Sequence, residues 1–177
     1  MLNPFPSLQY PKSKLVILAL LTINAVIYAL IDTMIGAADA IVWLVLLVIY
    51  ELESNSIELP ISEQGMRLIR DLLIGIIALV FLGYLLSGQL LDAINSLLWF
   101  ALIGMVETEV RWPALARQYE KTFWATTIAV FIALIAMAGV WIWLGDWFDA
   151  YDAILWIIAF GFIEVDIFRF LQRKSPL

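Results

Sequence analysis

Long apolar stretches alternate with short polar connections along the whole chain. A helix crosses a hydrocarbon core about 30 Å thick with about 20 residues, and on that measure the pattern predicts six membrane-spanning helices. They cover residues 14–31, 37–53, 70–87, 90–107, 122–145 and 150–168. The chain is therefore predicted to be an all-α integral membrane protein.

The basic residues lie on one side of these spans. Connections 32–38, 87–91 and 145–151 contain no lysine or arginine, and all ten basic residues fall at the opposite ends of the spans. Because basic residues accumulate on the cytoplasmic side, both termini are predicted to be cytoplasmic. The resulting segments are a cytoplasmic N-terminal segment 1–13, hairpins 14–53, 70–109 and 121–168, cytoplasmic loops 54–69 and 110–120, and a cytoplasmic tail 169–177.

The three hairpins share residues at fixed offsets, which indicates an internal repeat. An offset of 56 residues superposes Lys14 on Arg70 and Tyr28 on Tyr84. In each hairpin a tryptophan also stands eight residues before an acid-x-acid pair, and offsets of 56 and 113 superpose the three sets. These are Trp43 with Glu51 and Glu53, Trp99 with Glu107 and Glu109, and Trp156 with Glu164 and Asp166. Three such units are expected to pack as a six-helix bundle with approximate threefold symmetry.

The tripeptide DAI opens each returning helix. Its aspartates, Asp39, Asp92 and Asp152, are predicted to be helix N-caps, because aspartate accepts from the first N–H groups and complements the helix dipole. In the second hairpin the tripeptide stands three residues early, so Asn95 occupies the equivalent position. The three tryptophans of the repeat are predicted to anchor their helices at the membrane interface rather than to bind a ligand.

The acid pairs end the returning helices, where the helix dipole disfavours negative charge. The rise from Asp39 to Glu51 is ~18 Å as helix, well short of the ~30 Å core, so at least one acid per returning helix is expected at hydrocarbon depth. Such an acid must face the bundle interior, a partner or water. A local pair of Glu107 with Arg111 compensates part of this charge. The remaining compensation is expected from a partner protein or an ion.

The composition excludes several classes of function. The chain has no cysteine and no histidine, which excludes disulfides, thiolate metal sites and imidazole chemistry. A net charge of −6 without a basic patch argues against a nucleic-acid partner. No nucleophile arrangement and no glycine-rich phosphate loop is present, so neither an enzymatic activity nor a cofactor is expected.

Two functions stay open. In the first, the chain is a non-catalytic accessory or scaffold subunit of a larger complex, expected in a bacterial inner membrane, and its acids pair with other subunits or a second copy. In the second, it is a small channel or transporter for cations, divalent ions included, with Glu51, Glu107 and Glu164 as a carboxylate ring. Small size and a sparse polar lining favour the first function, and the triplicated acids favour the second.

Overall fold

A computed structural model describes residues 12–31, 34–54 and 61–173, and within these residues it contains helices and no strands. The long helices are α1 (Lys12–Ile31), α2 (Met34–Ser54), α3 (Glu63–Leu86), α4 (Leu90–Arg111), α6 (Glu120–Leu144) and α7 (Trp147–Arg173). A short helix, α5 (Pro113–Gln118), connects α4 to α6. The predicted all-α fold is confirmed.

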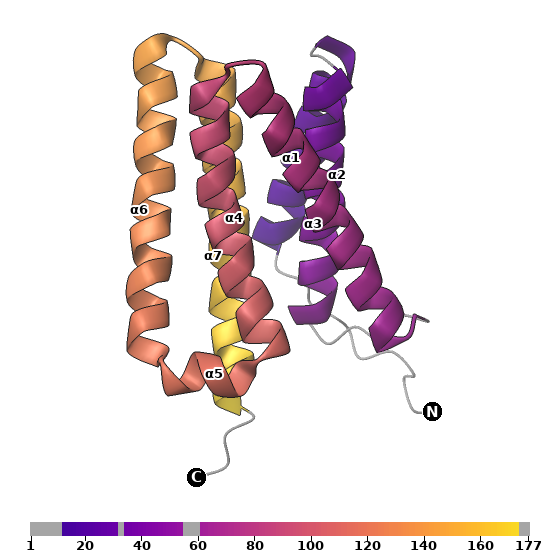
Figure 1. Ribbon diagram of the computed structural model, residues 1–177, viewed down its shortest axis with the longest axis vertical. Helices are drawn as coiled ribbons and strands as arrows, with labels where there is room; N and C mark the ends of the chain where they lie inside the picture. The colour runs from indigo at the N-terminus through magenta and orange to yellow at the C-terminus, as the bar shows by residue number, and fades with distance from the viewer. Residues whose placement is uncertain (1–11, 32–33, 55–60, 174–177) are drawn as a thin grey trace.

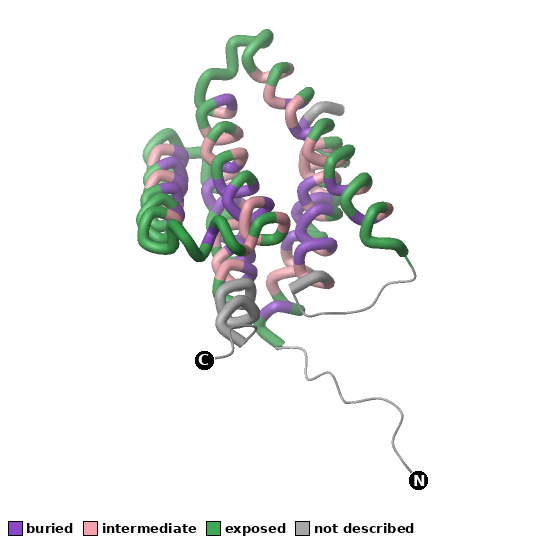
Figure 2. Tube along the Cα trace, turned by 60° about the horizontal axis from the view of Figure 1, so that its bottom comes forward, coloured by how far each residue is buried: buried purple, intermediate pink, exposed green. Residues whose placement is uncertain are grey.

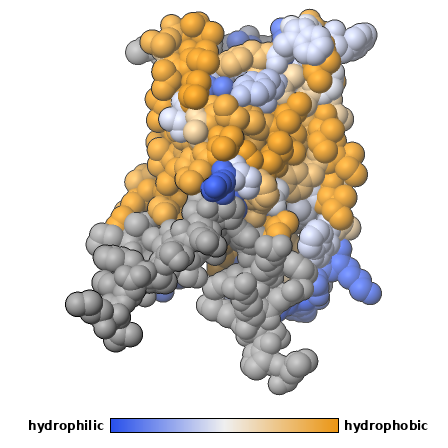
Figure 3. All heavy atoms as spheres, turned by 180° about the vertical axis from the view of Figure 1, so that it is seen from behind, coloured by the Kyte–Doolittle hydropathy of each residue, from blue (hydrophilic) through white to orange (hydrophobic). Residues whose placement is uncertain are grey.

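Four helices, α1, α3, α4 and α6, are long and apolar enough to cross a membrane. Large apolar side chains on their outer faces, such as Leu79 on α3 and Ile132 on α6, are exposed. Most of the face in Figure 3 is hydrophobic, and hydrophilic residues gather toward its ends. An apolar surface of this extent is what contact with lipid requires.

The long helices run side by side along the longest axis of the molecule (Figure 1). The α3–α4 and α6–α7 links lie at one end, here called the link end, and α5 lies at the other, the α5 end (Figure 1). Neighbours in sequence pack together: α1 with α2, α3 with α4, and α6 with α7. Helix α7 also contacts α1, α2 and α4, which places it inside the bundle.

Local sequence sets the helix ends. Gly88 after α3 (φ 76°) and Gly145 after α6 (φ 91°) adopt left-handed backbone, which glycine tolerates best. At the α5 end the Ser62 hydroxyl caps α3 by accepting from the Gly65 N–H at 3.1 Å. Pro113 cannot continue α4, but it suits the first turn of α5.

Two connections are more helical than the sequence predicted. The predicted loop 54–69 is shorter, because the Ser62 cap starts α3 at Glu63. The predicted loop 110–120 is largely helix, because α4 continues to Arg111 and α5 follows directly after it.

The core lies along the middle of the bundle, where buried segments face one another and exposed segments face outward (Figure 2). Leucine, isoleucine and phenylalanine side chains from different helices meet there. The fully enclosed ones include Leu21, Leu46, Ile77, Leu102, Leu134, Phe160 and Ile163.

Candidate functional site

A cavity of about 440 Å³ opens at the link end of the bundle. The last turns of α1, α3 and α6 and about the first three turns of α2, α4 and α7 supply its walls. It lies within the 300–1,000 Å³ range typical of small-molecule sites. The polar and aromatic residues that line it are Tyr28, Asp39, Trp43, Tyr84, Gln89, Asp92, Asn95, Ser96, Trp99, Trp141, Phe148, Asp149, Asp152 and Trp156.

Four aspartates line this cavity: Asp39 from α2, Asp92 from α4, and Asp149 and Asp152 from α7. No lysine or arginine is among the residues that the structure places along its walls. The charged side chains of the cavity wall are therefore all acidic, and each ionised carboxylate there favours a cation.

The N-cap role predicted for three of these aspartates is wrong. Helix α2 begins at Met34 and α7 at Trp147, so Asp39 and Asp152 lie in the second turn of their helices. Asp92 lies inside the first turn of α4, whose N-cap is Gln89. Helices α2 and α7 start three residues earlier than the apolar pattern suggested, whereas α4 starts at Leu90 as predicted. All three aspartates lie inside their helices and line the cavity.

Neutral donors from neighbouring helices hold the aspartates in place. Asn24 Nδ2 donates to Asp152 at 2.7 Å. The hydroxyl of Tyr28 donates to Asp149 at 2.8 Å, and the Tyr84 hydroxyl donates to Asp39 at 3.4 Å. These bonds orient the carboxylates and bring no positive charge to them.

The tryptophans of the repeat lie in the interior rather than at the membrane interface, so their predicted anchoring role is wrong. Trp43 and Trp99 are 8% and 7% exposed. The Trp43 ring lies 5.7 Å from that of Trp99 and 6.1 Å from that of Trp156, each edge-on. A residue four positions along a helix shares its face, so each tryptophan lies below Asp39, Asn95 or Asp152 and forms the deeper wall of the cavity.

At the α5 end, the chain itself compensates two of the predicted carboxylates. Lys14 on α1 forms an ion pair with Glu51 on α2. Arg70 on α3 lies 2.9 Å from Glu107 on α4, and Glu107 also accepts from Arg111, as predicted.

The Tyr50 hydroxyl completes the environment of Glu107 by donating to it at 2.8 Å. The expectation that a partner or ion would compensate Glu51 and Glu107 is therefore wrong. Lys14 reaches from α1 to the acid of α2, and Arg70 reaches from α3 to the acid of α4.

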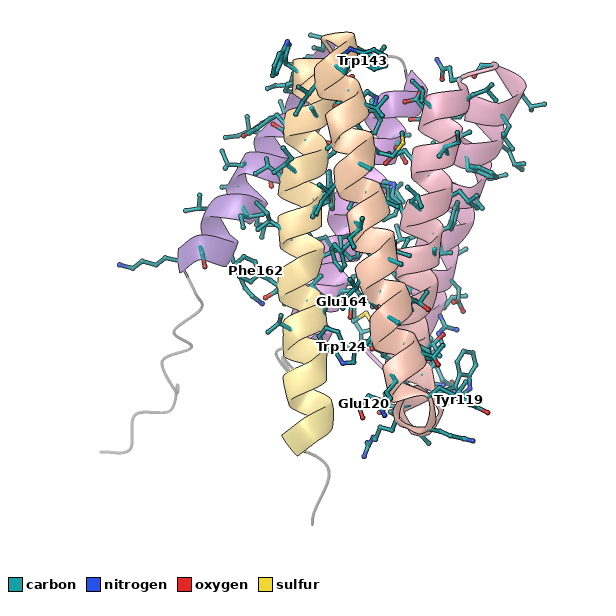
Figure 4. The ribbon with its side chains drawn as sticks, turned by 90° about the vertical axis from the view of Figure 1, so that its left-hand side faces the viewer. Tyr119, Glu120, Trp124, Trp143, Phe162 and Glu164 are labelled. Carbon is teal, nitrogen blue, oxygen red and sulfur yellow. The ribbon has the colours of Figure 1, made fainter. Side chains whose placement is uncertain are left out.

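The third hairpin lacks this pair. Thr127 on α6 stands at the sequence offset that corresponds to Lys14 and Arg70, and it is equally buried. Glu164 Oε1 and Glu109 Oε2 are buried without a hydrogen-bond partner among the described residues, and the two carboxylates repel each other. Glu164 lies in the half of the bundle nearer α5 (Figure 4).

The predicted ring of Glu51, Glu107 and Glu164 thus contains two carboxylates that basic side chains already occupy. Within the described residues, no three acidic side chains lie close enough together to hold a metal ion. The side chains of Glu53 and Asp166, also predicted as candidates, lie outside the part of the chain whose side chains the structure describes.

Sequence reasoning missed the residues that position the aspartates. Tyr28 and Tyr84 carried a signal, because they coincide at the repeat offset. Asn24, which donates to Asp152, stands out in the sequence as an amide inside an apolar span. Asp149, a cavity aspartate that was also missed, belongs to the acidic connection between the last two spans. Nothing in the sequence pairs these donors with particular aspartates.

Comparison of the chain with protein-family models, curated proteins and solved structures found no match.

Replacing Glu51, Glu107 and Glu164 with glutamine, one at a time, tests whether the first two depend on their basic partners while the third does not. Glu107→Gln and Glu51→Gln each leave a buried basic side chain without its counter-charge, and we expect Glu107→Gln to cost about 3 kcal/mol. Glu164→Gln removes a carboxylate that has a buried unpartnered oxygen, so we expect no loss of stability. Thermal unfolding of the three variants in one detergent measures the difference. Equal destabilisation by all three would contradict this expectation.

Proposed function

We propose that the chain is a six-span membrane protein, built from three helical hairpins, that binds a positively charged solute in the cavity at the link end. The observation that carries this proposal is the convergence of four aspartates, with no basic residue, on one cavity. Uncompensated carboxylates close to a membrane interior are costly, and a bound cation offsets that cost. Carboxylates that line a cavity also concentrate cations from solution.

Repeated burial supports the three-hairpin architecture. Leu21, Ile77 and Leu134 stand at the offsets of the repeat, and each is 1% exposed. The cavity follows the same offsets, because equivalent positions of the three hairpins line it. These positions are Tyr28, Tyr84 and Trp141; Gly36, Asp92 and Asp149; Asp39, Asn95 and Asp152; and Trp43, Trp99 and Trp156.

The distribution of basic residues supports an orientation for the bundle. Arg111 ends α4 and Arg117 lies on α5, both at the α5 end. The links at the opposite end contain no basic residue. By the positive-inside tendency, the α5 end and both termini are cytoplasmic, and the cavity opens outward.

The accessory-subunit function is the second candidate, and the α6–α7 link favours it. Trp143 and Trp147 are 85% and 66% exposed, and Figure 4 shows Trp143 at the link end of α6. Large exposed aromatic side chains beside an exposed aspartate, Asp146, form a surface of the composition found at protein interfaces. In that case a partner subunit docks over the link end, and it co-purifies with the chain in stoichiometric amount.

The orientation is testable because the chain has no cysteine of its own. We expect Asp146→Cys, in the α6–α7 link, to react with a membrane-impermeant maleimide added to intact cells. Gln118→Cys, on α5, should react only after the cells are permeabilised. Both positions are exposed in the bundle, so each serves as the accessibility control of the other. The reverse labelling pattern would overturn the orientation.

Cation binding is testable with the full chain in lipid nanodiscs. A panel of inorganic and organic cations is titrated at constant ionic strength, and heat of binding is recorded by calorimetry. We expect at least one cation to bind saturably. Because charge-assisted contacts contribute about 1.5–3 kcal/mol each, Asp39→Asn combined with Asp152→Asn should weaken that binding more than about tenfold.

Asp146→Asn is the matched control, since Asp146 is exposed at the link end and does not line the cavity. It removes one negative charge from the same end of the molecule and should leave the affinity unchanged. Absence of saturable binding by every cation in the panel would refute the proposed function.

A further inference from the structure

The geometry points to an organic ammonium ion as the solute that the cavity binds. This inference rests on the proposed cation-binding function and narrows it to one chemical class. The nitrogen of the ligand lies among the aspartates, and its carbon substituents lie against the tryptophan rings deeper in the cavity.

The arrangement of the carboxylates does not suit a bare metal ion. Magnesium and calcium need several oxygen ligands within about 2.0–2.6 Å of one point. In the described part of the chain, no group of three acidic side chains converges in that way. Asp39 and Asp152 are held instead on separate helices by their own donors, Tyr84 and Asn24. Carboxylates spread around the wall of a cavity suit a larger cation, whose positive charge is distributed over more atoms than that of a metal ion.

The deeper wall supplies what a substituted ammonium ion prefers. Trp43, Trp99 and Trp156 line the cavity directly below the aspartate positions. Tryptophan is the best aromatic partner for an ammonium group, which is attracted within about 6 Å of the ring, and cages of aromatic rings bind quaternary ammonium ions. Tyr28, Tyr84 and Phe148 add further rings to the same walls.

The volume agrees with a molecular ligand. A cavity of about 440 Å³ is far larger than a dehydrated metal ion needs. An inorganic ion would leave the tryptophan wall in contact with water, whereas an alkylammonium ion covers that wall with its apolar groups. Carboxylates next to tryptophan rings therefore favour a cation whose charged nitrogen carries carbon substituents.

The edge-on contacts fix the ring positions before any ligand binds. Trp43 packs against Trp99 at 5.7 Å and against Trp156 at 6.1 Å, and Phe160 supports them from below, 5.4 Å from the Trp99 ring. A preformed wall loses little conformational entropy on binding. The rings are therefore placed to act as a rigid part of the site.

The test compares tetraethylammonium, potassium and magnesium chlorides on the full chain in nanodiscs, by calorimetry at constant ionic strength. We expect tetraethylammonium to bind at least about tenfold more tightly than either inorganic ion. Trp156→Leu should reduce this preference about tenfold. Trp143→Leu should not, because Trp143 is 85% exposed and lies outside the cavity wall.

The outcomes distinguish binding of an organic ammonium ion from binding of cations in general. Binding of potassium or magnesium without tetraethylammonium, lost in Asp39→Asn with Asp152→Asn, would overturn the organic class and keep a cation site. Binding of none of the cations would overturn both. If Trp156→Leu does not fold, Phe148→Leu replaces it, since Phe148 is only half-buried on the cavity wall. Unchanged tetraethylammonium affinity in the folded variant would overturn the role of the rings.

Discussion

A carboxylate taken out of water must meet a counter-charge or several donors, and this constraint shapes both ends of the bundle. At the α5 end, Lys14 and Arg70 reach from the first helix of a hairpin to Glu51 and Glu107 on the second. Each ion pair ties two antiparallel helices together where no loop holds them. At the link end, Asp39, Asp149 and Asp152 accept hydrogen bonds from neutral donors. Basic side chains of the chain thus compensate Glu51 and Glu107 at the first end, and the proposed ligand would compensate the aspartates at the second.

Helical periodicity turns one repeated sequence pattern into these two different environments. An aspartate position and a tryptophan four residues later share a face, so both point toward the bundle interior. The glutamate eight residues beyond the tryptophan lies a little over two turns further on, rotated by about 80° from it, because 3.6 residues make one turn. One broad face of each of these helices thus carries an acid or amide, a tryptophan and a glutamate at successive depths. Inside the bundle these depths correspond to the cavity, the aromatic rings and the glutamates.

The sequence predicted the all-helical fold, because the lengths of apolar stretches depend only on local composition. It did not predict which face of a helix turns inward. Trp43 was expected at the membrane interface because tryptophan is common there, yet it lies in the core. Its edge-on contacts with Trp99 and Trp156 depend on the crossing of three helices. The Arg70–Glu107 contact likewise joins residues of two helices, and only the shared offset with Lys14 and Glu51 hinted at it.

Two positions break the sequence pattern that the predicted hairpins share, and each changes the charge of its surroundings. Thr127 replaces the basic residue in the third hairpin, and Asn95 replaces the aspartate in the second. The first change leaves Glu164 close to Glu109 and, among the described residues, without a basic counter-charge of the kind that Glu51 and Glu107 have. The second change makes the cavity wall asymmetric, because Asn95 on α4 stands at the position that Asp39 and Asp152 hold on α2 and α7, while the carboxylate of α4, Asp92, lies about one turn earlier. A strictly threefold cavity would offer a ligand three equal orientations, whereas an amide opposite two carboxylates distinguishes one direction from the others. In the proposed site, this difference between the helices would let an asymmetric cation take a single pose.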